Sequence, residues 1–140
     1  NGPMVGAQLL LAWAAEGGAP AGRIRQLLRK EDMPSEILAQ LLEQILRLKQ
    51  ENKPLSPAEL LSEYPQEEEA GRQIAAIYSK SLSPEREAGE RAHILSANLQ
   101  RLRKESIQKA LRNNPNAEET RRLTKELGDL KKLRITEADL

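Results

Sequence analysis

The segment from Pro34 to Asn52 would carry apolar residues around more than half of its circumference if it formed a helix. These residues are Ile37, Leu38, Leu41, Leu42, Ile45, Leu46 and Leu48. Other helices must enclose such a helix, because a helix at a protein surface needs only one apolar stripe. We therefore expect this segment at the centre of a multi-helix bundle, with Leu41 and Leu42 deepest in the core.

Helical periodicity and helix-end signals recur along the rest of the chain. Ser56-Pro57-Ala58-Glu59 can form a capping box, and Asn116 can cap a helix in which Glu119 follows three residues later. The 140 residues include no Phe and no convincing strand pattern, so Leu, Ile and Ala must build a helical core. Helices are expected over about residues 5–16, 21–30, 34–52, 57–64, 67–80, 83–111 and 117–134.

The long helix expected over residues 83–111 has two apolar stripes, and the second is rotated around the helix relative to the first. The first consists of Ala88, Ala92, Leu95, Leu99 and Leu102, and the second of Ile107, Ala110 and Leu111. A continuous stripe would need apolar residues at Ser106 and Lys109, so the second half should leave the bundle. There it can pair with the last helix across the turn at residues 113–116.

The predicted fold is all-α, a multi-helix bundle followed by a C-terminal helical hairpin and joined to it through a long helix. We expect residues 1–105 to form the bundle and residues 106–140 to form the hairpin. Residues 83–134 hold 13 basic and 8 acidic residues, whereas residues 1–82 hold 9 basic and 11 acidic residues. A basic hairpin with few apolar residues indicates docking to an acidic partner rather than catalysis.

Signals for catalysis, cofactors or membranes are weak. The chain has no Cys, no Gly-rich phosphate loop and no nucleophile motif, and its longest apolar run, Leu9 to Ala15, is too short to cross a bilayer. We expect no enzyme activity, no cofactor and no metal in what we interpret as a cytoplasmic, monomeric fragment of a longer protein. Glu67-Glu68-Glu69 is better explained by the dipole at a helix start, and His93 by a surface or half-buried position. Trp13 is expected to anchor the first helix in the core.

Nucleic-acid binding is an alternative for the basic hairpin. The side chains that could contact phosphates are Arg101, Arg103, Lys104, Lys109, Arg112, Arg121, Arg122, Lys125, Lys131, Lys132 and Arg134. The hairpin has no aromatic residue on which single-stranded bases could stack, and glutamates alternate with its cations. We therefore favour a protein partner over nucleic acid.

The order of these signals resembles the C-terminal helicase-binding domain of DnaG-type bacterial DNA primases. The resemblance covers essentially the whole chain and depends on short motifs, which are Ile24 to Leu28, Glu31-Asp32-Met33, Leu60-Leu61-Ser62-Glu63-Tyr64, Leu99-Gln100-Arg101-Leu102-Arg103-Lys104-Glu105-Ser106-Ile107 and Leu127-Gly128-Asp129-Leu130-Lys131-Lys132. It implies a non-catalytic domain of a primase that binds the N-terminal domains of the hexameric replicative helicase at the replication fork. The hairpin would dock and the bundle would modulate helicase and primase activity.

The N-terminal domain of the helicase itself, which has the same architecture, is a rival interpretation. A nucleic-acid-binding helical regulator is another. For the primase interpretation we predict a partner-binding set on the last helix, consisting of Arg122, Leu123, Lys125, Leu127, Leu130, Lys131, Lys132 and Leu133. Its leucines would be divided between the hairpin interior and the helicase, and its cations would set orientation and association rate.

Overall fold

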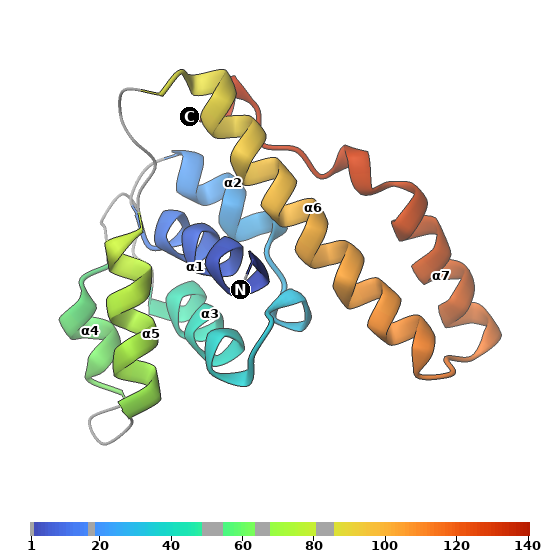
Figure 1. The fold of residues 1–140 in the computed structure, drawn as a ribbon, viewed down its shortest axis with the longest axis horizontal. Coiled ribbons are helices and arrows are strands. Elements are labelled where there is room, and N and C mark those ends of the chain that lie inside the picture. The colour runs from blue at the N-terminus through green and yellow to red at the C-terminus, as the bar shows by residue number, and fades with distance from the viewer. Residues whose placement is uncertain (1, 17–18, 49–54, 64–67, 81–85) are drawn as a thin grey trace.

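The computed structural model describes residues 2–16, 19–48, 55–63, 68–80 and 86–140, and every regular element in these ranges is a helix (Figure 1). The α-helices are α1 Gly2–Ala14, α2 Ala19–Leu27, α3 Glu36–Leu48, α4 Pro57–Leu61, α5 Glu68–Ser79, α6 Ala88–Arg112 and α7 Ala117–Gly128. Three short 3-10 turns join them, η1 Lys30–Asp32, η2 Leu130–Lys132 and η3 Glu137–Asp139. The predicted all-α fold, a bundle followed by a helical hairpin, is confirmed.

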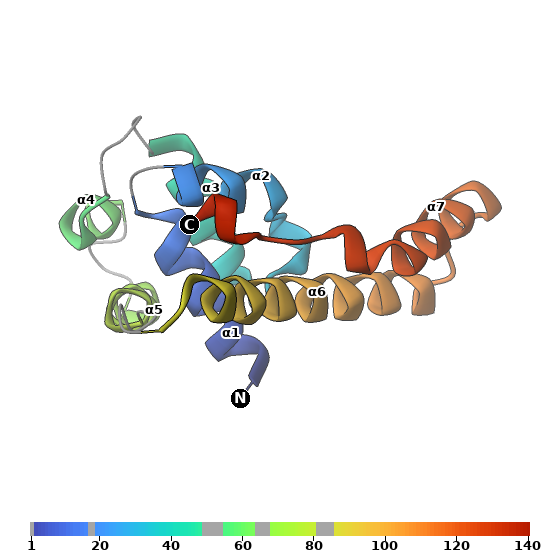
Figure 2. The same ribbon diagram turned by 90° about the horizontal axis from the view of Figure 1, so that it is seen from above.

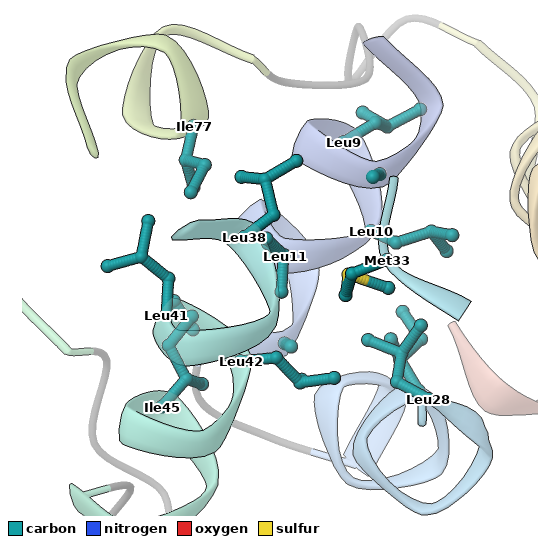
Figure 3. Close-up of a cluster of buried hydrophobic side chains, with 14 of the residues drawn as sticks. Leu9, Leu10, Leu11, Leu28, Met33, Leu38, Leu41, Leu42, Ile45 and Ile77 are labelled. Atoms are coloured by element: carbon teal, nitrogen blue, oxygen red, sulfur yellow. The ribbon is translucent and has the colours of Figure 1, made fainter. Parts of the chain in front are cut away.

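The bundle core lies between α1, α3 and their neighbours (Figure 3). Leu41 and Leu42 of α3 are 0% exposed, as expected. Leu46 is different, because 43% of it is exposed at a solvent edge of α3. The helix that is most enclosed is α1, which packs against α2, α3, α5 and α6. Its consecutive Leu9, Leu10 and Leu11 are all buried, since neighbours surround it on several sides.

Helix boundaries agree with the sequence where local signals determine them. At α4, Ser56 Oγ accepts from the Glu59 amide at 3.2 Å and Glu59 Oε1 accepts from the Ser56 amide at 3.1 Å, which completes the predicted capping box. At α7, Asn116 Oδ1 accepts from the Glu119 amide at 2.8 Å. These predicted caps are confirmed.

Other boundaries differ from the expectation. The long helix begins at Ala88 rather than near Ser83, because Glu87 is an N-cap with extended backbone (φ −65°, ψ 149°). Helix α3 begins at Glu36 rather than Pro34, and Ser35 Oγ accepts from the Leu38 amide. The expectations that concern residues 17–18, 49–54, 64–67 and 81–85 lie outside the described residues.

Removing the cap of α7 should destabilise the hairpin. Asn116→Ala is expected to lower the free energy of unfolding by about 1 kcal/mol, because it leaves an amide of the first turn without its side-chain acceptor. Urea denaturation followed by circular dichroism would measure this change. Asn113→Ala is the matched control on the other side of the turn, and an equal loss in both variants would contradict a capping role.

The hairpin extends beyond the bundle, and α6 passes through the stripe break at Ser106 as one continuous helix (Figures 1 and 2). The turn contains Asn114 in the left-handed region (φ 53°), which Asn tolerates better than most residues. Helix α7 then packs along the second half of α6, where Ile107 and Leu123 are both buried. The predicted pairing of the second stripe with the last helix is confirmed at these two residues.

After η2 the chain runs back along α6 to the bundle (Figure 1). Ile135 is 3% exposed within the core, and the Ser96 hydroxyl is hydrogen-bonded to both its amide (2.8 Å) and its carbonyl (3.1 Å). Gln100 also donates to the Leu133 carbonyl at 2.9 Å. The hairpin is therefore attached to the bundle at both ends, an arrangement that the sequence analysis did not foresee.

Candidate docking surface on the helical hairpin

The four leucines predicted for partner binding point to different places. Leu123 is buried in the hairpin, and Leu133 packs against the bundle core. Leu127 and Leu130 are half-buried and border a surface hollow. Only this second pair is placed to offer apolar surface to a partner.

The four predicted cations also differ in their surroundings. Arg122 forms ion pairs with Glu119 and Glu126, both at 3.4 Å. Lys125 and Lys132 both approach Asp129, at 3.8 Å and 3.4 Å. Lys131 forms no ion pair with any residue that the structure describes. A carboxylate of a partner can therefore pair with the Lys131 ammonium group without first displacing a described acidic side chain.

The α6–α7 hollow is a surface cavity of about 630 Å³ that lies between α6 and the C-terminal end of α7 together with η2. Its lining consists of Ala97, Gln100, Arg101, Lys104, Leu127, Gly128, Leu130 and Lys131. None of the described residues that line it is acidic, so it combines apolar walls with a positive rim. The hollow therefore brings Leu127, Leu130 and Lys131 of the predicted set together with residues of α6.

The residues of α6 that line the hollow were only partly predicted from the sequence. Arg101 and Lys104 were predicted as possible phosphate contacts, but Ala97 and Gln100 were missed. The spacing of Ala97, Arg101 and Lys104 by four and three residues places them on one helix face, and that signal could have identified the wall. The Arg101 guanidinium donates to the Gly2 carbonyl at 2.8 Å and to Asn98 Oδ1 at 3.1 Å, so it is held towards α1. Lys104 forms no ion pair with any described residue.

A second groove separates the hairpin from η1 and the start of α3. It has a volume of about 720 Å³, and its walls carry charges of both signs. Arg29 crosses it to reach Glu126 at 3.3 Å. The groove does not favour a ligand of either charge, because both acidic and basic side chains line it. Arg29 and Glu126 already form an ion pair across it.

A buried ion pair at the base of this groove fixes α6 to η1. Arg103 Nε donates to Asp32 Oδ2 at 2.5 Å, Arg103 Nη2 donates to the Leu27 carbonyl at 2.7 Å, and both side chains are almost fully buried. Burial raises the pKa of Asp32 above its ordinary value, and the hydrogen bond and charge of Arg103 oppose this only in part. Ser106 adds a hydrogen bond to the Glu31 carbonyl at 3.0 Å.

This contact corrects one expectation and explains another. Arg103 cannot contact phosphates as predicted, because its guanidinium is enclosed and paired with Asp32. The apolar stripe of α6 breaks at Ser106 because the helix there meets the polar backbone of η1 instead of the apolar core. The polar side chain of Ser106 is thus suited to the polar backbone of η1 that it contacts.

The remaining candidate residues lie apart from the hollow. His93 is exposed, and Trp13 is half-buried against the core rather than fully enclosed. Within the described ranges no three His, Asp or Glu side chains gather as a metal site would require. None of the helices in these ranges is both long and apolar enough to cross a membrane.

No protein-family model matches the chain, and no match was found among curated proteins or among solved structures.

Proposed function

We propose that this chain is the helicase-binding domain of a DnaG-type bacterial DNA primase, a cytoplasmic protein-interaction module without a catalytic site of its own. In this proposal the hairpin docks on the N-terminal domains of the hexameric replicative helicase. The bundle is the platform that couples docking to helicase and primase activity. The RNA-polymerising activity would belong to the parent primase.

The observation that carries the proposal is the placement of Leu127 and Leu130. Both lie on a hairpin that extends beyond the bundle core, and both remain half-exposed beside cations that have no acidic neighbour in the hollow. Apolar side chains in a hollow, surrounded by a polar rim, form the usual centre of a protein interface. The motif resemblance, which covers both the bundle and the hairpin, supports the choice of partner.

The direct test is a calorimetric titration of the chain with the purified replicative helicase of the organism that encodes it. Saturable binding to the hexamer and to its isolated N-terminal domain is expected. Deleting residues 106–140 would be a poor control, because it would also remove Ile135 from the bundle core. Point substitutions in the hollow are therefore preferable. Absence of binding to the intact helicase would refute the proposal.

Leu130→Ala is expected to weaken helicase binding by about 1–3 kcal/mol, or roughly 5- to 150-fold in Kd, if the side chain contributes to the centre of the interface. The same titration measures this effect. Leu46→Ala is the matched control, since Leu46 is an exposed leucine on the bundle. If Leu130→Ala and Leu46→Ala bound the helicase with equal affinity, Leu130 would not be part of the interface.

The two rival functions predict different results in binding and self-association experiments. A helicase N-terminal domain would self-associate, or bind a primase C-terminal domain, and light scattering would show the larger species. A nucleic-acid-binding regulator would bind DNA with an affinity that falls steeply as salt rises. Lys109, Arg112 and Arg121, near the turn, have no described ion pair and would be the first contacts to test.

A further inference from the structure

We infer that the α6–α7 hollow is a socket for an acidic amphipathic helix of the partner, which would insert one apolar side chain between carboxylates that face Lys104 and Lys131. This inference rests on the proposed function and adds the chemistry of the bound segment. Its basis is the juxtaposition of apolar walls and two lysines, on different elements, that form no ion pair with a described residue.

The hollow determines what kind of group can enter it. Ala97, Leu127 and Leu130 supply apolar wall, and burial of an apolar side chain there is favourable because it removes hydrocarbon surface on both sides from water. Hydrated phosphates gain nothing from such walls, and none of the described lining residues is an aromatic on which a base could stack. An apolar protein side chain therefore fits better than nucleic acid.

The charges determine what must flank that side chain. Lys104 belongs to α6 and Lys131 to η2, so two different elements each contribute one cation to the lining. Neither forms an ion pair with any part of the chain that the structure describes. Residues three or four apart on a helix share one face, so an α-helix can present an apolar residue with Asp or Glu on either side of it.

The experiment compares two double charge reversals in titrations with the helicase. Lys104→Glu combined with Lys131→Glu alters the hollow. Lys109→Glu combined with Arg121→Glu alters two hairpin cations that lie outside the lining and outside the predicted partner-binding set, and that form no ion pair with any described residue. Both variants change the net charge equally, so long-range attraction changes by a similar amount. All four substituted side chains are exposed, and circular dichroism would confirm that both variants are folded.

The hollow variant is expected to bind about tenfold or more weakly, and the control variant within about threefold of wild type. In a second arm, reversing exposed acidic residues of the helicase N-terminal domain to Lys should identify at least one that restores binding of the hollow variant. Equal weakening of both variants, or no weakening of either, would overturn the socket while the proposed function stands. A wild-type chain that fails to bind helicase would overturn both. DNA binding that only the hollow variant loses would assign the hollow to nucleic acid instead.

Discussion

Asp32→Ala is expected to lower the free energy of unfolding by about 3–5 kcal/mol, because it leaves the Arg103 guanidinium buried without its counter-charge. Arg103 would keep its bond to the Leu27 carbonyl, but that acceptor carries no full charge. Urea denaturation followed by circular dichroism would give the difference. The loss is a large fraction of the total stability of an ordinary domain, which is about 5–15 kcal/mol.

The control for this prediction is an ion pair at the surface. Arg47 and Glu63 approach to 2.6 Å, but their side chains are 63% and 38% exposed. Glu63→Ala should therefore cost no more than about 1 kcal/mol. A double variant, Asp32→Leu with Arg103→Met, should be more stable than Asp32→Ala because it leaves no buried charge. If Asp32→Ala proves as mild as Glu63→Ala, the pair does not hold α6 to η1.

Leu42→Ala is expected to cost about 2–5 kcal/mol, the second large effect. Leu42 is 0% exposed at the centre of the bundle, so truncation removes buried hydrocarbon and leaves a cavity that close-packed neighbours fill only in part. The same urea denaturation would measure this change. If the slope of the free energy of unfolding against urea concentration stays the same, the substitution has lowered the stability of the folded protein without changing how much surface unfolding exposes.

Leu46→Ala is the internal control for this cavity effect. It changes the same residue type one helical turn further along α3, at a position that is 43% exposed. A change within about 0.5 kcal/mol is expected there. Similar losses at Leu42 and Leu46 would contradict the observed orientation of α3.

The sequence predicted those parts of the fold that depend on residues close together in the chain. The caps at Ser56 and Asn116 and the turn at Asn114 each follow from chemistry within three or four residues. The core positions of Leu41 and Leu42 follow from helical periodicity alone. The start of α6 at Ala88 was not predicted, because Ser83-Pro84-Glu85 permits a helix to begin near residue 83 but does not require it.

Contacts between distant segments account for what was missed. Arg103 and Asp32 are separated by 71 positions, and nothing local distinguishes Arg103 from its exposed basic neighbours. The return of Ile135 to the core depends on Ser96, 39 positions away. For the docking surface, leucine periodicity placed the hairpin but could not say which leucines face inward. Leu127 and Leu130 were separated from Leu123 and Leu133 only by the packing of α7 and the tail.

The double attachment of the hairpin has a mechanical consequence. Helix α6 spans 25 residues and is therefore a rod about 37 Å long, whose bundle end packs on α1. The hydrogen bonds between Ser96 and Ile135 tie the returning C-terminal segment to the same helix. A force applied at the hairpin would therefore reach the bundle by two routes, through α6 to α1 and through the tail segment that is hydrogen-bonded to Ser96.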